Sequence, residues 1–157
     1  QKWTQQASNW ATEAADYVSR GRNLDYSEKE RRCLEANIYY EARNQDRDGM
    51  IGVGLVTLNR VEDERWEDSI CGVVSEPWQF SWTRKGYPEY PEPDNQADRE
   101  ALQEIQQAVS FLLSGGANYV VHLAQDANFY HNPDTVEWQY ADNYQELGDV
   151  GDHRFYA

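Results

Sequence analysis

The chain has 157 residues, of which 39% are hydrophobic and 27% charged, a composition typical of a globular protein rather than a disordered one. Acidic residues outnumber basic ones by 28 to 14, and the net charge of −14 argues against partners such as nucleic acid or an anionic membrane surface. No apolar run approaches the ~20 residues that span a bilayer, so we expect no membrane insertion. No signal peptide is visible, and the chain begins at Gln1 rather than Met, so the export route is not visible in this sequence.

The first 26 residues read as an extension, with a helix over 1–20 and a linker over 21–26. The helix follows from an apolar stripe at helical spacing, formed by Ala7, Trp10, Ala14 and Val18. A single domain is expected over 27–157. Its first helix should begin at Ser27, which forms a capping box with Glu30, and should run to about Arg43.

A second apolar helix is predicted over 50–61 after a polar turn at 44–49, and Gly52 and Gly54 would let it pack closely. A strand remains the alternative for VGLVTL, because periodicity does not decide so short a run. Asp68 is the candidate cap of a short helix over 69–75. Residues 76–95 contain four of the five prolines and form a long loop, a kind of segment that is often functional.

The last strong helix begins at Asp94 or Asn95 and should end at Gly115 and Gly116. The segment NYVVHL, at 118–123, is a candidate strand. From 126 to the C-terminus, the polar and aromatic sequence predicts loops with short turns.

Glu41 is unusual because it is a carboxylate on the apolar side of the predicted helix that begins at Ser27. On a helix, Glu41 falls on the same side as Leu34 and Ile38, whereas Arg43 points away. Burial raises the pKa of a carboxyl group, and such a group can serve as a general acid. The alternative is a structural ion pair, for which the candidate cations are Arg43, Arg60 and Arg65.

The cysteines and histidines give weaker indications. Cys33 and Cys71 either form one disulfide or remain two buried thiols, and both alternatives stay open. A metal hydrolase would need ligands such as His122, His131 and His153. These lie at no recognised metal-binding spacing, so we expect no metal and no other cofactor.

Several blocks together resemble the family of cell-wall hydrolases that includes the spore-cortex-lytic enzyme SleB. They are CLEANIYYEARNQDRDGMIGVGLVTLNRV, ICGVV, QFSW, ANFYHN, Trp138 and VGDHRFYA, in this order from about residue 30. The chain departs from the family pattern before Trp138, where it reads TVEW, at Pro77 and Trp78, and in the loop from Gly86 to Asp94. These departures concern the substrate cleft more than the chemistry. The resemblance leaves open whether a bacterium or a phage encodes the chain.

The resemblance implies an α+β fold that is mainly α-helical, a lysozyme-like single domain with a small β element. It implies cleavage of the β-1,4 bond between N-acetylmuramic acid and N-acetylglucosamine in peptidoglycan, with Glu41 as the catalytic acid. We expect a monomer that acts at the bacterial cell wall, in the periplasm, outside the cell or on a phage particle. A peptidoglycan-binding module without activity is the alternative from another class.

The mechanism expected is that of a lytic transglycosylase, in which Glu41 acts first as acid and then as base. A hydrolytic muramidase would need a second carboxylate, for which the sequence offers Asp46, Asp48 and Glu76. Substrate contacts are expected from two groups of residues and from Tyr40. The groups are Gln79, Phe80, Ser81 and Trp82, and then Phe129, Tyr130 and His131. Tyr130 or Tyr40 would either orient Glu41 or hold the acetamido group of the substrate, whereas His153 and Tyr156 are expected to be structural.

Overall fold

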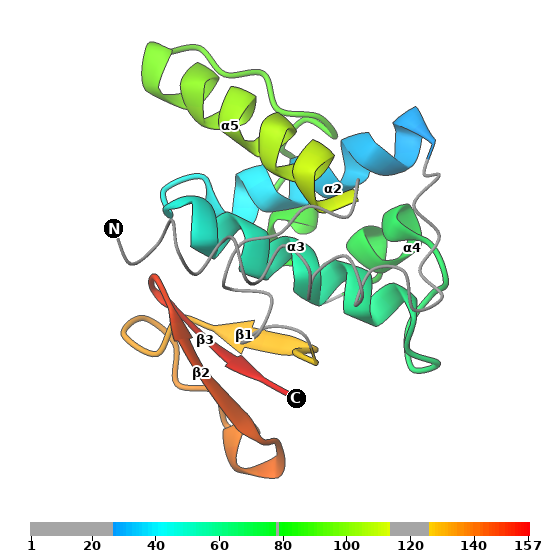
Figure 1. Ribbon diagram of the computed structural model, residues 1–157, viewed down its shortest axis with the longest axis vertical. Coiled ribbons are helices and arrows are strands. Elements are labelled where there is room, and N and C mark those ends of the chain that lie inside the picture. The colour runs from blue at the N-terminus through cyan, green and yellow to red at the C-terminus, as the bar shows by residue number, and fades with distance from the viewer. Residues whose placement is uncertain (1–26, 78, 114–125) are drawn as a thin grey trace.

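The computed structural model describes residues 27–77, 79–113 and 126–157, as a layer of helices above a small antiparallel sheet (Figure 1). The extension at 1–26, the strand at 118–123 and the helix end at Gly115 and Gly116 lie outside the described residues. In chain order the elements are α2 (Glu28–Ala42), α3 (Arg47–Val61), α4 (Ile70–Ser75), η1 (Ser81–Arg84), α5 (Gln96–Leu113), β1 (Phe129–His131), η2 (Ala141–Asn143), β2 (Glu146–Val150) and β3 (His153–Tyr156).

Helix α2 begins as predicted, but its capping box is only half closed. Ser27 is the N-cap and accepts a hydrogen bond at 3.2 Å from the backbone N–H of Glu30. The Glu30 carboxylate does not reach back to Ser27. It accepts instead from the backbone N–H of Cys71 at 2.9 Å, in the first turn of α4. The same glutamate therefore links α2 to α4. Its negative charge lies at the N-terminus of α4, where the partial positive charge of the helix dipole stabilises it.

Residues 50–61 form a helix, as predicted, and the strand alternative is wrong. The helix begins at Arg47, earlier than predicted, because Asp46 caps it by accepting from the backbone N–H of Gly49 at 3.0 Å. The short helix α4 is capped by Ser69 rather than Asp68. Asn95 caps α5 by accepting from the backbone N–H of Asp98 at 2.8 Å, as predicted.

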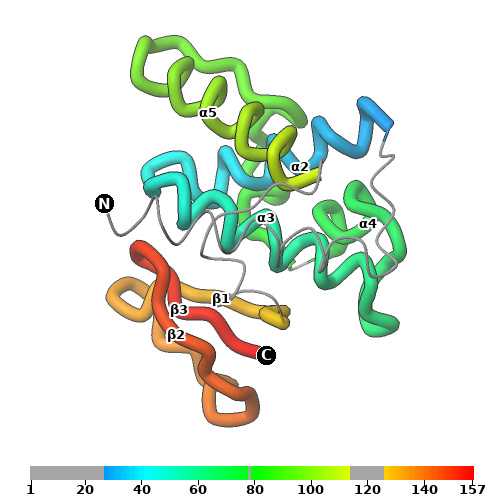
Figure 2. The backbone as a smooth tube through the Cα atoms, in the orientation of Figure 1, coloured from blue at the N-terminus to red at the C-terminus, as the bar shows by residue number. Residues whose placement is uncertain are grey.

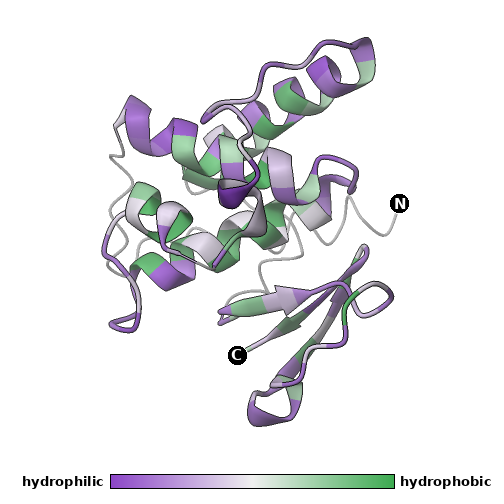
Figure 3. Ribbon diagram, turned by 180° about the vertical axis from the view of Figure 1, so that it is seen from behind, coloured by the Kyte–Doolittle hydropathy of each residue, from purple (hydrophilic) through white to green (hydrophobic). Residues whose placement is uncertain are grey.

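Helix α3 is the centre of the fold and lies between the sheet and the other helices (Figure 2). A Cβ atom at Gly52 would lie 2.6 Å from the ring of Phe155 on β3, and one at Gly54 would lie 3.1 Å from Leu112 on α5. Gly54 therefore allows the close helix packing that the sequence predicted, whereas Gly52 allows the sheet to approach α3, which was not predicted. Apolar residues gather where the helices face one another, and the outer side of α5 is largely hydrophilic (Figure 3).

The C-terminal segment is a three-stranded antiparallel sheet with the order β1-β3-β2, so the prediction of loops over 126–157 is wrong. Tyr130 pairs with Phe155, and this pair faces the helices because Phe155 packs against Gly52. Phe129 pairs with Tyr156 on the opposite face. Aromatic side chains cover both faces, so the sequence lacks the alternation of polar and apolar residues that marks a half-exposed strand.

A disulfide joins Cys33 on α2 to Cys71 on α4, with the two Cα atoms 5.3 Å apart. This resolves the two alternatives that the sequence left open. None of the helices in the described part of the chain has both the length and the apolar character needed to cross a membrane.

Candidate active site

Glu41 lies in the last turn of α2, with its carboxyl group half-buried beneath the helical layer. Leu34 and Ile38, which share its side of the helix, belong to the hydrophobic core. Arg43 points the other way, and its Nε lies 3.4 Å from Oδ1 of Asp98 on α5. The predicted orientation of both side chains is therefore confirmed, and Arg43 is not the ion-pair partner of Glu41.

Tyr130 donates its hydroxyl hydrogen bond to Oε1 of Glu41. The pairing of β1 with β3 places Tyr130 on the face of the sheet that meets the helices. Its ring packs against His153, at 4.9 Å between centroids, and against Phe155, at 5.8 Å. Two residues of β3 thus fix the ring that positions the Glu41 carboxyl group. The contact of His153 agrees with its predicted structural role.

Burial raises the pKa of Glu41 above that of an ordinary carboxyl group. The hydrogen bond from Tyr130 and the positive charges of Arg60 and Lys85 oppose this shift without cancelling it. Burial and the neighbouring Glu41 charge raise the pKa of Tyr130 well above its usual value, so its hydroxyl keeps its proton. The site therefore contains a carboxyl group suited to hold a proton and a tyrosine fixed as its donor.

Arg60 is a part of this site that the sequence indicated only as one of three possible cations. It is only 5% exposed, and its Nε donates to the backbone oxygen of Asn128 at 2.8 Å. Its guanidinium carbon lies between 5.1 and 5.6 Å from three ring centroids, those of Trp66, Phe80 and Phe129. Burial lowers the pKa of Arg60, and the charge of Glu41 raises it. The signal in the sequence was a lone charge within the otherwise uncharged run 49–61.

The first predicted group of sugar-contacting residues divides into exposed and buried members. Gln79 is exposed, and its Oε1 accepts from Nη1 of Arg60 at 3.4 Å and from Nε1 of Trp66 at 3.3 Å. Ser81 is also exposed. Phe80 and Trp82 are 2% and 8% exposed and belong to the core. Their burial favours a packing role over open stacking on a sugar.

Tyr40 does not contact Glu41 through its hydroxyl, which donates to the backbone oxygen of Pro88 at 2.7 Å. Its ring lies between Trp82 and Tyr87, at 4.5 and 5.1 Å between centroids. Of the two tyrosines predicted to orient Glu41, the structure places Tyr130 in that position. Tyr40 instead lines a pocket of about 200 Å³ together with Tyr39, Arg43, Tyr87, Pro88 and Glu92.

The second predicted group divides between the two faces of the sheet. Tyr130 faces Glu41, whereas His131 lies on the opposite face, with its ring 5.4 Å from Tyr156 and 5.8 Å from Trp138. Phe129 is also on that face, 4.4 Å from Tyr144 between centroids. It still reaches the neighbourhood of Arg60 at one edge of the sheet. The strand period of two explains why these three neighbours in sequence do not converge on one carboxyl group.

The candidate second carboxylates are not among the groups that act on Glu41. Within the described parts of the chain, the pKa of Glu41 responds to Tyr130, Arg60 and Lys85, none of which is a carboxylate. The side chain of Asp46 caps α3, and Asp48 lies in the first turn of the same helix. The charge of Glu76 acts on Arg60.

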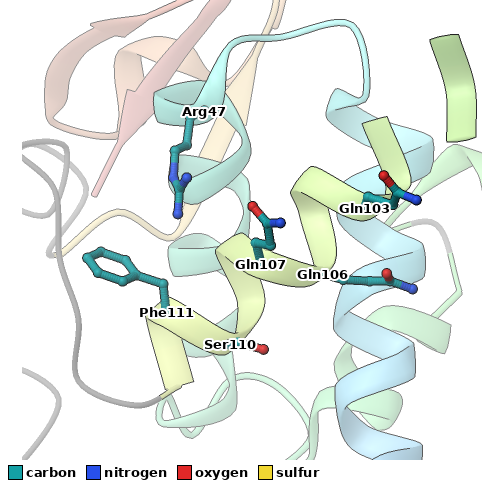
Figure 4. A pocket seen from close by; sticks show the side chains of 6 residues that line it. All are labelled: Arg47, Gln103, Gln106, Gln107, Ser110 and Phe111. Atoms are coloured by element: carbon teal, nitrogen blue, oxygen red, sulfur yellow. The ribbon is translucent and has the colours of Figure 1, made fainter. Parts of the chain in front are cut away.

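The remaining candidates are a metal site and a second hollow, and neither involves Glu41. Residues 27–77, 79–113 and 126–157 include no cluster of three or more histidine, cysteine, aspartate or glutamate side chains able to hold a metal ion, and His122 lies outside these ranges. A hollow of about 650 Å³ lies along α5 and the start of α3 (Figure 4). It is lined by Arg47, Gln103, Gln106, Gln107, Ser110 and Phe111, none of which was predicted for the site.

The chain is similar to curated spore cortex-lytic enzymes. It is 29% identical over 130 residues to the enzyme of Halalkalibacterium halodurans and 27% identical over 140 residues to that of Bacillus subtilis. These alignments cover 83% and 89% of this chain but only 35% and 41% of the relatives, so the chain spans well under half of their length.

Two solved structures show the same fold. One is the catalytic domain of the germination-specific lytic transglycosylase SleB from Bacillus anthracis, with a TM-score of 0.63 and 23% identity. The other is the catalytic domain of the Bacillus cereus SleB protein, with a TM-score of 0.60 and 24% identity. The matches cover 85% and 88% of this chain and 98% and 100% of the two domains. The predicted lysozyme-like α+β fold, mainly helical with a small sheet, is therefore confirmed.

A family model described as Cell Wall Hydrolase matches residues 44–156, which is most of the chain. The match begins after Glu41, so the role of Glu41 has to be argued from the site itself. It includes Tyr130, which donates to Glu41, and Arg60, whose positive charge acts on Glu41. It also includes Gln79, which accepts a hydrogen bond from Arg60. The chain belongs to the cell wall hydrolase family.

Proposed function

We propose that this protein cleaves the β-1,4 bond between N-acetylmuramic acid and N-acetylglucosamine in peptidoglycan, as a lytic transglycosylase with Glu41 as its acid and base. One observation carries the proposal: the half-buried Glu41 accepts a hydrogen bond from Tyr130, and its pKa is raised. A chain of the cell wall hydrolase family has peptidoglycan as its expected partner, and the bacterial cell wall is where it would act.

The first step transfers the proton of Glu41 to the glycosidic oxygen, so that the bond from the muramyl C1 to this oxygen breaks. The raised pKa keeps Glu41 protonated in a larger fraction of molecules near neutral pH. The neighbouring N-acetyl group of the substrate stabilises the positive charge that develops at C1. The sugar that leaves carries the proton away as a hydroxyl group.

The second step returns the proton to the enzyme. The 6-hydroxyl group of the same muramyl residue attacks C1, and the Glu41 carboxylate accepts the hydroxyl proton. The product is a 1,6-anhydromuramyl end, and Glu41 is protonated again. No water is consumed and no second carboxylate takes part, in contrast to ordinary glycoside hydrolysis.

Tyr130 and Arg60 are the positioning residues of this mechanism. The Tyr130 hydroxyl holds one oxygen of Glu41 and leaves the other for the substrate. Arg60 stabilises the carboxylate that exists between the two steps, because its positive charge acts on Glu41 from the interior. Gln79 is held by Arg60 and Trp66 with its side chain exposed, and it is our candidate for binding an acetamido or hydroxyl group of the sugar.

Two observations favour the transglycosylase outcome over a hydrolytic muramidase. Asp46, one of the candidate second carboxylates, is engaged in capping α3, where it accepts from the backbone N–H of Gly49 at 3.0 Å. The similar SleB domain from Bacillus anthracis is named a lytic transglycosylase. A peptidoglycan-binding module without activity would have no need of a buried carboxyl group held by a tyrosine.

Mass spectrometry of the fragments released from purified peptidoglycan tests the proposal. We expect 1,6-anhydromuramyl ends from the wild type and none from Glu41→Gln. Glu35→Gln is the matched control, because Glu35 is also buried on α2 and also accepts from a tyrosine, Tyr90, at 2.8 Å. Reducing muramic acid ends would establish a muramidase instead. The second carboxylate would then be sought at Asp46, Asp48 and Glu76.

A further inference from the structure

The loop from Gly86 to Asp94 is held firmly against α2 and α5. The Tyr90 hydroxyl donates to Oε1 of Glu35 at 2.8 Å and accepts from Nε2 of Gln106 at 3.0 Å. The guanidinium carbon of Arg32 lies 3.8 Å from the centroid of the Tyr90 ring. Pro91 is buried beside it. The loop is therefore a fixed wall in this structure.

This wall and α2 enclose the pocket of about 200 Å³ that Tyr40 lines. The hydrogen bond from the Tyr40 hydroxyl to the backbone oxygen of Pro88, at 2.7 Å, joins α2 to the loop at this pocket. Tyr87 stacks on Tyr40 with 14° between the ring planes, yet Tyr87 is 51% exposed. An exposed ring on a fixed loop, beside the residue that precedes Glu41, is well placed to contact a substrate.

The pocket carries one charge of each sign. Arg43, the C-cap of α2, lines it with its guanidinium carbon 5.2 Å from the centroid of the Tyr39 ring, and its Nε also lies 3.4 Å from Oδ1 of Asp98. Glu92 lines it from the loop. Burial raises the pKa of Tyr40, and the charges of Tyr39 and Glu92 add to this shift. The remaining lining is aromatic or apolar, from tyrosine rings and Pro88. A matching ligand has a carboxylate and an ammonium group on a short aliphatic body.

We propose that this pocket binds the charged end of the peptide stem of peptidoglycan, with the stem carboxylate at Arg43, its ammonium group at Glu92 and its aliphatic part on Tyr87. The N-acetylated sugars of the strand have no ammonium group, whereas the diamino acid of a stem has both charges. The stem also begins on the muramyl sugar, whose bond Glu41 cleaves under the proposed function on which this inference rests. Tyr40 directly precedes Glu41 on α2, and Arg43 is the C-cap of the same helix.

Steady-state kinetics on two substrates test the inference. One is peptidoglycan with tetrapeptide stems that contain meso-diaminopimelate, and the other is the same glycan with its stems removed by an amidase. Tyr87→Ala and Glu92→Gln should raise KM on the first substrate about tenfold, the effect of one lost charged or stacked contact. Neither should change kcat, and neither should change KM on the stripped strands.

Matched controls remove equivalent charges outside the pocket. Glu89→Gln alters the same loop and Arg99→Gln alters α5, and both residues are exposed. Both variants should behave as the wild type on both substrates. An equal rise in KM on stripped strands would overturn the proposal in favour of a sugar-binding pocket, and an unchanged KM on both substrates would overturn it outright.

A separate titration distinguishes this inference from the proposed function. If the wild type releases no fragments from either substrate, the proposed function fails, but the pocket can still be tested with the free tetrapeptide as the probe. Nuclear magnetic resonance should then show peptide binding to the wild type and about tenfold weaker binding to Tyr87→Ala. Absence of binding to the wild type, or equal binding to both, would overturn the pocket assignment.

Discussion

The hydroxyl of Tyr130 meets the carboxylate of Glu41 across a sequence separation of 89 residues. One residue comes from the end of a helix and the other from an edge strand of the sheet. Their contact depends on the side of α2 from which Glu41 projects and on the face of the sheet on which Tyr130 lies. The hydrogen bond fixes the orientation of the Glu41 carboxyl group, the proposed proton donor. A substitution at either residue should therefore change the pKa or the orientation of this group.

Replacing Tyr130 by phenylalanine should lower activity and shift its dependence on pH. The hydrogen bond from Tyr130 lowers the pKa of Glu41, so its loss should raise that pKa further. The alkaline limb of the kcat profile should move to higher pH, while kcat falls about tenfold to a hundredfold because Glu41 loses its orientation. Profiles of fragment release against pH measure both effects.

Tyr90→Phe provides the control for Tyr130→Phe, because Tyr90 donates to a different glutamate of α2, the buried Glu35. It should leave the alkaline limb of kcat in place. A Tyr130→Phe profile with an unmoved alkaline limb would show that the hydrogen bond does not influence the catalytic proton.

Glu41→Gln should stabilise the protein at neutral pH. Because the folded-state pKa of Glu41 is raised, the folded protein resists its ionisation more than the unfolded chain does. Its contribution to stability is fully present below the unfolded-state pKa and is lost as pH rises through the folded-state pKa. A tenfold difference between the acid dissociation constants of the folded and unfolded states corresponds to about 1.4 kcal/mol of unfolding free energy.

Thermal unfolding of the wild type and of Glu41→Gln at pH 4 and pH 7 measures how the contribution of Glu41 to stability depends on pH. The gain in Tm of the variant should be larger at pH 7 than at pH 4. The amide still accepts the hydrogen bond from Tyr130, so packing is preserved. A gain that is the same at both values would contradict a raised pKa for Glu41.

Reduction of the disulfide should destabilise the helical layer. Cys33 and Cys71 are separated by 38 residues, and closure of a loop of this length is worth about 4 kcal/mol in the chain-entropy model. The double variant Cys33→Ala and Cys71→Ala should show a lower free energy of unfolding in urea, and a reducing agent should lower that of the wild type but not of the variant. Equal stability of the oxidised wild type and the double variant would contradict this.

The helices could be predicted from the sequence because their caps and apolar stripes are local signals. Ser27 and Asn95 each accept a backbone hydrogen bond within the following turn, so both partners of each bond lie within one short stretch of sequence. The side of α2 on which Glu41 lies also follows from helical geometry alone.

The sheet and the partners of Glu41 could not be predicted from local patterns. The strands β1 and β3 have three and four residues, and aromatic side chains on both faces remove the alternation that would reveal them. Arg60 was visible only as one of three possible cations, because its distance from Glu41 depends on how α3 crosses α2. The resemblance supplied the proposed role of Glu41, and the structure supplied the side chains that act on its pKa.

Gly52→Ala should reduce both stability and activity, because the sheet rests on this glycine. A Cβ atom there would lie 2.6 Å from the Phe155 ring, which no side chain tolerates without movement. Overpacking of this kind costs about 1–3 kcal/mol. Phe155 pairs with Tyr130 in the sheet, so a shift of Phe155 away from α3 also draws the Tyr130 hydroxyl from Glu41.

Gly54→Ala is the matched control, since its Cβ would meet Leu112 and Ile38 at 3.1 and 3.2 Å rather than Phe155. We expect Gly54→Ala to lower Tm with kcat unchanged, and Gly52→Ala to lower both. Adding Phe155→Leu to Gly52→Ala makes room at the contact and should recover part of the lost Tm. If the two glycine variants lose kcat equally, the contact between Gly52 and Phe155 does not determine the position of Tyr130.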